Sequence, residues 1–283
     1  GASAGIGSYT AEALYRQGAT VYMACRNEEK TQKVISQIKK KKVNYEGGSL
    51  NFIKLDFNNL ESVRECAREF LHGGLVLDVL INNAGCAVGG ERYSVQGYEE
   101  MFQSNVLGHH LLVDLLWNNM NGNPNGARIV IVSSYAHMFI KDYEFYNTEK
   151  KVHTLMNRNK QYGFTKLCNI YQTYYFNERI KNTPNCKVTV NACHPGAIKS
   201  ELSREVPYGL QSLISLIQYF FFVDLEIGSQ NTLHLACSKD VSGISGKFFD
   251  QCAVKEPLPI TKNKELYNEL VDLCEKVCSS YSL

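Results

Sequence analysis

The chain has 283 residues, enough to bury one substantial core, and its 44% apolar and 20% charged residues are ordinary for a globular protein. A formal net charge of +2 at pH 7 gives no reason to expect a nucleic-acid partner, so we predict none. Repeats, low-complexity stretches and Pro/Gly/Ser linkers are absent from the sequence, which indicates one domain over 1–283.

The ten cysteines are scattered along the chain and form no CxxC pair. Cys274 and Cys278 lie four residues apart in a helix-like tail, but no second ligand pair accompanies them, so the sequence predicts no metal site. Unpaired, mostly buried thiols in a reducing compartment fit this usage. We therefore expect an intracellular protein, in the cytoplasm or on the cytoplasmic face of an internal membrane. No uncharged apolar run reaches the ~18 residues of a transmembrane helix.

Short apolar runs alternate with helical patterns along the whole chain. The patterns predict strands over 19–24, 50–55, 77–81, 127–133, 187–192 and 247–249, and helices over 28–41, 60–71, 95–119 and 163–181. Strands that alternate with helices of this length are joined by right-handed crossovers and form a parallel sheet covered on both faces. The expected fold is a single-domain, Rossmann-type, doubly wound α/β sheet.

The beginning of the chain lacks one element of this fold. A dinucleotide-binding sheet needs a strand that feeds its first glycine turn, whereas Gly1 is already the first glycine of that turn. Such a strand would lie between 19–24 and 77–81. Without it, buried backbone groups would go unpaired at about 1–3 kcal/mol each. We therefore expect the native protein to begin earlier than Gly1.

Gly1, Gly5 and Gly7 form a GxxxGxG motif that opens an apolar helical pattern. Glycines let the backbone turn tightly and approach a pyrophosphate, and the helix N-terminus adds N–H donors and a positive dipole end. The same motif fits a turn that only packs a helix against a sheet. Its position before a helix and then the strand over 19–24 favours nucleotide binding, with Ile6 inside the turn.

The residues after the strand over 19–24 bear on the choice of cofactor. NAD-dependent enzymes usually carry an acidic residue there, whereas this chain has Cys25 and Arg26, and no carboxylate before Glu28. Arg26 can meet a 2′-phosphate through a charge-assisted contact, and Ser3 could add a second hydrogen bond. We therefore favour NADP(H) over NAD(H). The alternative for Arg26 is a surface arginine that begins the next helix.

Short motifs lie at or just beyond the carboxyl ends of the remaining predicted strands, where ligands bind in open α/β sheets. They are Asn83, Ala84 and Gly85 after 77–81, Ser133 and Ser134 at the end of 127–133, Tyr162 and Lys166 at the start of a helix, and His194, Pro195 and Gly196 after 187–192.

The ordered set GxxxGxG, NNAG, a serine that ends a strand, YxxxK and PG resembles the classical short-chain dehydrogenase/reductase family over nearly the whole chain. Several stretches resemble its retinol dehydrogenase-like branch: Ala24 to Arg26, Leu55-Asp56, Asn105 to His109, Tyr162 to Asn169, His194 to Gly196 and Ser200 to Leu202. The resemblance implies that Asn105 holds a water in a proton relay. It also implies that Asp56 contacts adenine, that Lys166 binds the nicotinamide ribose and that Ser200 lies near the nicotinamide. A buried amide that caps nearby backbone is the alternative for Asn105.

The chemistry of carbonyl reduction explains these residue types. The oxygen gains negative charge as it accepts hydride, so a proton donor must lie within hydrogen-bond reach. Tyr162 is the candidate acid, and the base in the reverse direction. Lys166, four residues later on the same helical face, is expected to lower the pKa of Tyr162. Ser134 is expected to hold the substrate oxygen beside Tyr162.

Two of these assignments have competitors in the sequence. Tyr146 and Lys150 also form a YxxxK motif, but they lie in a polar stretch that resembles an insertion, whereas Tyr162 begins an amphipathic helix leading to the next strand. Ser133 competes with Ser134, which is the serine that matches the family pattern. We assign Tyr162 and Ser134, and we interpret His109, His110 and His194 as structural.

Two segments are expected to shape the substrate pocket, the insertion over 135–161 and the apolar stretch over 206–225. The second fits a lid over a lipophilic substrate, a membrane-surface contact or a homodimer interface, and a lid fits best because the resembled family has its substrate loop here. The expected substrate is a small hydrophobic carbonyl or alcohol, such as a retinoid or lipid aldehyde. The rival functions are a catalytically silent nucleotide-binding scaffold and a Rossmann-type methyltransferase, which has no need of YxxxK.

Overall fold

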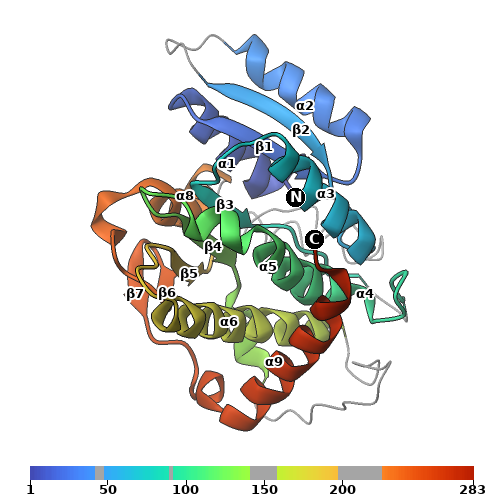
Figure 1. Ribbon diagram of the computed structural model, residues 1–283, viewed down its shortest axis with the longest axis vertical. Coiled ribbons are helices and arrows are strands. Elements are labelled where there is room, and N and C mark those ends of the chain that lie inside the picture. The colour runs from blue at the N-terminus through green and yellow to red at the C-terminus, as the bar shows by residue number, and fades with distance from the viewer. Residues whose placement is uncertain (42–47, 89–91, 141–157, 197–224) are drawn as a thin grey trace, which may run out of the picture.

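The computed structural model describes residues 1–41, 48–88, 92–140, 158–196 and 225–283. Its strands form two sheets, which Figure 1 shows as a blue pair set apart from the remaining strands. The first sheet contains β1 (Thr20–Cys25) and β2 (Ser49–Lys54), and the second contains β3 (Val79–Asn82), β4 (Arg128–Val132), β5 (Thr189–Cys193), β6 (Lys247–Asp250) and β7 (Ala253–Lys255) in that order. All neighbouring strands are parallel except β6 and β7. The predicted α/β fold with a parallel sheet is confirmed.

Helices cover both faces of these sheets. They are α1 (Gly5–Arg16), α2 (Glu28–Lys40), α3 (Leu60–His72), α4 (Glu100–Phe102), α5 (Gly108–Asn121), α6 (Arg158–Asn182), α8 (Leu225–Cys237) and α9 (Lys264–Cys278). Helices α3, α5 and α6 share one face, and α9 packs against α5 and α6 from outside, while α1 and α8 pack together on the other face. Asparagines begin several of these helices: the Asn27 and Asn59 side chains accept backbone N–H bonds from the first turns of α2 and α3.

The alternation of side chains along β4 explains how the core is divided. Ile129 and Ile131 face the main apolar cluster, which includes residues of α3, α5, α6 and α9, whereas Val130 and Val132 face a second cluster with α8. This period of two, with both faces apolar, is typical of a parallel strand buried on both sides. A third cluster joins β1 and β2 to α1 and α2.

The helix predicted over 95–119 is wrong at its start. Tyr93 and Glu99 instead form an antiparallel bridge around a turn in which Gly97 has a φ of +82°. The chain becomes helical only at α4, and a π-helical turn, Gln103–Leu107, separates α4 from α5. A glycine in the left-handed region interrupts a helix, so the apolar pattern before residue 100 packs as a turn.

A cavity of about 610 Å³ lies between β1 and β3, the facing edges of the two sheets. Apolar side chains line much of it, among them Val21 of β1, Leu80 of β3 and Ala11 of α1. The cavity lies where the sequence analysis expects a strand ahead of Gly1. That expectation remains a prediction.

The described helices differ from helices that span a lipid bilayer. None of them combines the length and the apolar character that a membrane-crossing helix requires.

Candidate active site

The glycine turn packs directly against the loop that follows β3. The Asn83 side chain donates a hydrogen bond to the Gly1 carbonyl oxygen at 3.1 Å. A Cβ atom at Gly7 would lie 2.1 Å from that oxygen, and one at Gly1 would lie 2.7 Å from the Ala84 Cα. A side chain at Gly1 or Gly7 would therefore push the turn away from this loop. The close packing of the turn thus requires glycine at both positions.

The turn leads into the N-terminus of α1, where the N-cap side chain accepts no hydrogen bond from the backbone N–H groups of the first turn. Ala4 is the N-cap residue and offers no side-chain hydrogen bond, and the first turn, which contains Ile6, has no acidic residue. Gly5 has a φ of +57°, which a glycine adopts without strain. Free N–H groups and the positive end of the helix dipole suit the pyrophosphate of a dinucleotide.

Two basic residues, Arg26 and Lys54, lie at the carboxyl end of the β1–β2 pair. Arg26 is exposed immediately after β1, and its carbonyl oxygen accepts a 2.6 Å hydrogen bond from Lys54 Nζ. Lys54 pairs in register with Cys25, whose sulfur accepts a hydrogen bond from the Ala2 nitrogen and interacts with Ser3. Arg26, Ser3 and the glycine turn therefore lie at one edge. Lys54 adds a positive charge there that the sequence analysis missed.

Asp56 lies just beyond the end of β2 and is partly buried. One of its carboxylate oxygens accepts a 3.0 Å hydrogen bond from the Asn58 nitrogen, and its own nitrogen donates to Ser62. The side chain thus shapes the turn before α3. Its expected contact with adenine stays a prediction.

The serine, tyrosine and lysine of the predicted catalytic set come together at the ends of β4 and α6. The Tyr162 phenol lies near enough to the Ser134 hydroxyl for that group to affect its pKa, and Lys166 Nζ lies 5.6 Å from the centre of the Tyr162 ring. The Ser133 hydroxyl is committed elsewhere, because it donates to the Lys166 carbonyl at 2.7 Å. Ser134 is thus the serine that faces Tyr162. This geometry lets one phenol and one hydroxyl approach the same substrate oxygen.

Burial has the largest effect on the pKa values of Tyr162 and Lys166. It raises the pKa of Tyr162 to about 12, and the nearby Ser134 hydroxyl offsets part of this rise. It lowers the pKa of Lys166 to about 8. The expected lowering of the Tyr162 pKa by Lys166 is therefore wrong for this structure. The reason is the burial of the phenol, which disfavours the charged phenolate. The Lys166 ammonium is held in place by the Val132 carbonyl, to which it donates at 2.9 Å, and by Asn169 at 3.2 Å.

Asn105 holds the loop after Gly85 in place from the π-helical turn. Its side-chain oxygen accepts from the Cys86 nitrogen and its amide donates to the Cys86 carbonyl, both at 2.9 Å. The amide also donates to the Thr165 hydroxyl of α6 at 3.1 Å. Asn105 is fully buried, so it joins the NNAG loop to the helix that carries Tyr162. Its expected part in a proton relay stays a prediction.

The loop after β5 completes the edge as far as the structure describes it. The His194 ring accepts a 3.3 Å hydrogen bond from the Tyr135 nitrogen, and burial lowers the pKa of His194 to about 4, so the ring is neutral. Pro195 and Gly196 follow, with a φ of +84° at Gly196. Ser200, Tyr146 and almost all of the segment over 206–225 lie outside the described residues.

The residues at this edge fit a nicotinamide dinucleotide. A glycine turn that a Cβ would distort, an uncapped helix N-terminus and two cations beside β1 lie at one end, and the Tyr162 group lies at the other. Comparison with known proteins decides the family. The profile of the family described as short chain dehydrogenase matches residues 1–164.

The chain belongs to the short-chain dehydrogenase family.

A curated relative of this short-chain dehydrogenase indicates its branch. Retinol dehydrogenase 14 of Mus musculus is 34% identical over 285 residues, which cover 97% of this chain and 83% of the relative. The predicted family and its retinol dehydrogenase-like branch are confirmed, and so is the prediction of an oxidoreductase enzyme.

Solved structures agree on the fold of the short-chain dehydrogenase. A protein of uncharacterised function from Mycobacterium paratuberculosis superposes with a TM-score of 0.69 at 26% identity, over 99% of this chain and 91% of that one. A short-chain dehydrogenase from Burkholderia cenocepacia J2315, solved in complex with NADP, has a TM-score of 0.65 at 20% identity, over 88% of this chain and 92% of that one.

The sequence analysis also missed a buried carboxylate near the predicted catalytic residues. Glu99 accepts hydrogen bonds from the Met101 and Phe102 nitrogens at the start of α4 and from the Gln161 side chain at 2.9 Å. Gln161 precedes Tyr162 in the chain. The cap could have been predicted, because a glutamate lies two or three residues before an apolar helical pattern. Nothing in the sequence indicates that the same glutamate bonds to Gln161.

Proposed function

We propose that this chain is an NADP-dependent oxidoreductase that interconverts a carbonyl and an alcohol, with Tyr162 as the general acid and base. The observation that carries the proposal is the position of the Lys166 ammonium, 5.6 Å from the centre of the Tyr162 ring, with the Ser134 hydroxyl near the same phenol. Proton transfer by a positioned side chain typically accelerates a reaction by about 10²–10⁴-fold.

Each side chain has a separate part in reduction. Tyr162, which is protonated at neutral pH, donates its phenolic proton to the carbonyl oxygen as negative charge builds there. Ser134 donates a hydrogen bond to the same oxygen and positions it. Lys166 contributes positive charge and is proposed to bind the nicotinamide ribose. The bound nicotinamide supplies the hydride in reduction and accepts it in oxidation.

The preference for NADP over NAD is supported by charge at the end of β1. Arg26 is exposed and Lys54 bonds to its carbonyl oxygen, so two cations can meet a 2′-phosphate. The Burkholderia short-chain dehydrogenase of the same fold binds NADP. Ser3 lies close enough to Cys25 to reach the same region.

The proposed substrate is a small hydrophobic carbonyl or alcohol, such as a retinoid or lipid aldehyde. The apolar sequence over 206–225 supports it, and a similar protein carries the name retinol dehydrogenase. A membrane-surface contact or a homodimer interface would use the same apolar segment. Sedimentation and vesicle binding would distinguish these two from a lid.

The test follows the absorbance of reduced nicotinamide with the purified protein. NADPH and NADH are compared with retinal and with a panel of medium-chain and aromatic aldehydes. We expect turnover with NADPH, and a loss of about 10²–10⁴-fold in kcat/KM for Tyr162→Phe. Tyr174→Phe, on the same helix, is the matched control, and Tyr146→Phe tests the competing YxxxK motif. Both are expected to stay near wild type.

Each contrary outcome overturns a defined part of the proposal. Nucleotide binding without turnover across the panel would favour the catalytically silent scaffold. A preference for NADH would overturn the role given to Arg26 but leave the reaction class intact. An inactive Tyr146→Phe enzyme with an active Tyr162→Phe enzyme would overturn the assignment of the acid.

A further inference from the structure

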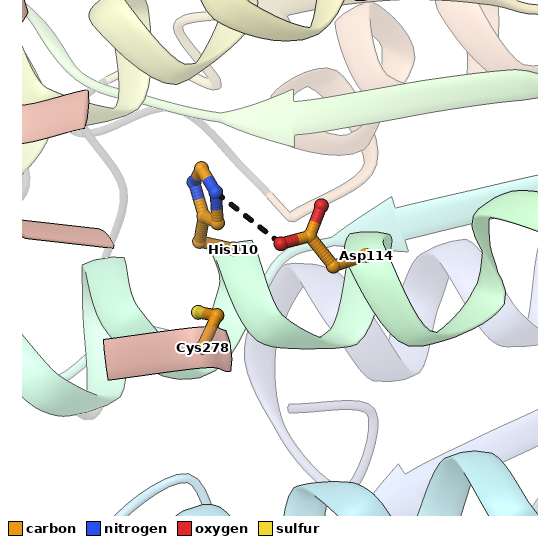
Figure 2. Close-up of side chains that lie close together, drawn as sticks. All are labelled: His110, Asp114 and Cys278. Atoms are coloured by element: carbon orange, nitrogen blue, oxygen red, sulfur yellow. Dashed lines mark ion pairs between the residues drawn. The ribbon is translucent and has the colours of Figure 1, made fainter. Parts of the chain in front are cut away.

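Three side chains of metal-binding type meet where α5 packs against α9. His110 and Asp114 lie one turn apart on α5, and Cys278 is the last residue of α9. One potential ligand atom from each lies within 4.8 Å of the other two. Figure 2 shows the three side chains converging, with Cys278 reaching the His110–Asp114 pair from the neighbouring helix.

The His110 imidazole lacks the hydrogen bonds that a buried ring needs. Its side chain is 1% exposed, and among the described residues neither ring nitrogen has a hydrogen-bond partner. The nearest recorded polar contact is Asp114, whose Oδ2 lies 3.5 Å from His110 Nε2. Tyr175 and Phe176 pack against the ring, with centroids at 5.0 and 4.8 Å. A buried polar group without partners in a native fold requires an explanation, and a bound ion is one.

The Asp114 carboxylate is already oriented toward the ring. Its Oδ1 accepts a 2.6 Å hydrogen bond from Arg179, whose guanidinium lies 4.2 Å from the centre of the Trp117 ring. Oδ2 is left facing His110. An outer partner of this kind fixes the direction of a ligating carboxylate in known metal sites. The Asp114 side chain is 24% exposed, so solvent reaches the cluster from this side.

We propose that His110, Asp114 and Cys278 form a zinc-binding site that joins α5 to α9. Imidazole, carboxylate and thiolate are the three ligand types that zinc takes in proteins, at about 2.0–2.3 Å. Three atoms within 4.8 Å of one another all lie within about 2.8 Å of a common point, so side-chain shifts of about 0.5–0.8 Å suffice. Water on the Asp114 side completes a tetrahedral site.

His110 and Asp114 provide the second pair of ligands that the sequence does not show near its cysteines. His110 and Asp114 are far from Cys278 along the chain, and only the packing of α9 on α5 brings them together. The cluster also lies away from the proposed catalytic group, because Tyr175 and Phe176 are about two and a half turns beyond Lys166 on α6. Zinc binding here does not depend on the proposed reaction.

The experiment uses the full chain, stripped with a chelator and dialysed. Titration with Zn²⁺ is followed by elemental analysis after gel filtration, and Co²⁺ is used as a spectroscopic probe of thiolate ligation. We expect one zinc ion per chain, a thiolate-to-cobalt charge-transfer band and a zinc-dependent rise in Tm.

Variants assign the ligands and provide the control. Cys278→Ala should abolish the charge-transfer band, while Asp114→Asn and His110→Phe should weaken zinc binding at least tenfold. Cys66→Ala is the matched control, because Cys66 is 5% exposed and Cys278 6%; it should bind zinc like wild type. Circular dichroism checks that each variant folds. Absence of saturable zinc binding by the wild-type protein, or an unchanged cobalt spectrum in folded Cys278→Ala, would overturn the proposal.

Discussion

Lys166 is an ammonium held almost out of water, with 2% of its surface exposed. Its bonds go to the Val132 carbonyl and the Asn169 amide oxygen, which bring no full negative charge. Neutral acceptors offset only part of the cost of burying a charge, so burial lowers the pKa of Lys166 to about 8. The Lys166 ammonium therefore loses its positive charge near pH 8, where the folded protein can still be studied.

The rate of carbonyl reduction should depend on pH through Lys166. Below pH about 8 the ammonium is charged, and as pH rises through about 8 the charge is lost. Tyr162 stays protonated over this range, because its pKa is about 12. We predict a kcat/KM for reduction that is flat below pH 8 and falls above it, measured with NADPH in overlapping buffers. Circular dichroism across the same range is the control for unfolding. A profile that stays flat to pH 10 would contradict this role.

Arg26 should control the choice between the two dinucleotides. The Arg26→Ala substitution removes a charge-assisted contact to the 2′-phosphate, and about 1.4 kcal/mol corresponds to a tenfold change in affinity. We predict that the Kd for NADPH rises about tenfold while the Kd for NADH stays within twofold, measured by fluorescence titration. Lys33→Ala, which removes an exposed cation of α2, is the control. Equal losses for both dinucleotides would rule out a contact with the phosphate.

At the scale of elements, the Glu99 carboxylate connects the segment that leads to Asn105 with the helix that carries Tyr162. It caps α4, which leads through the π-helical turn to Asn105, and it bonds to Gln161 beside Tyr162. Glu99 is only 4% exposed, and burial raises its pKa. A single side chain thus sets the start of one helix and the position of another.

Removing this carboxylate should affect stability and turnover together. Glu99→Ala leaves the Met101 and Phe102 nitrogens without their partner, and losing an N-cap costs about 0.5–2 kcal/mol. We predict that kcat also falls while the KM for NADPH changes little, because Tyr162 is displaced. Asn263→Ala is the control, since Asn263 likewise accepts two backbone N–H bonds at the start of α9. A stability loss without any change in kcat would show that Glu99 is only a cap.

The sequence predicted elements well where periodicity was strong. The strand predicted over 19–24 is β1, Thr20–Cys25, and the helix predicted over 60–71 is α3, Leu60–His72. Strand ends could be located, so the motif residues around Tyr162 could be placed at one edge. The start of α4 could not be located from the sequence. The apolar pattern continues through this region, but the bridge between Tyr93 and Glu99 keeps the chain from forming a helix there.

Contacts between distant segments limited the prediction of the site. Lys54 reaches Arg26 only because β2 pairs with β1 in a register that no local pattern specifies. The bond between Glu99 and Gln161 joins segments 62 residues apart. The pKa of Tyr162 was predicted in the wrong direction, since the i+4 spacing of Lys166 does not reveal how deeply the phenol is buried.

At the scale of the whole molecule, one apolar cluster spans both sheets. Ile53 of β2 and Ile131 of β4 belong to it, although no recorded strand pairing joins β1 or β2 to the other described strands. Helices α3 and α5, which pack together, bridge the two sheets through this cluster. Shared burial of this kind makes separate parts of a domain unfold together.

Substitutions on the two sheets should therefore shift the same transition. Ile53→Ala and Ile131→Ala each leave a cavity in the main cluster and should cost about 2–5 kcal/mol. We predict one cooperative urea transition in both variants, followed by fluorescence and circular dichroism, with a lower midpoint than wild type. Val95→Ala, at a side chain that is 71% exposed, is the control and should stay close to wild type. Two separated transitions would contradict a single domain over 1–283.

The glycine turn lies at the seam between the two sheets. The Gly1 nitrogen donates to the Ala24 carbonyl of β1 at 2.9 Å, and the Gly1 carbonyl accepts from Asn83 beyond β3 at 3.1 Å. A dinucleotide bound on this turn would brace both sheets at once, and a ligand that binds only the folded state raises stability in proportion to the logarithm of its concentration. Amide hydrogen exchange in β1 and in β3 should then slow together as NADPH is added, so that the cofactor serves as part of the scaffold as well as a reactant.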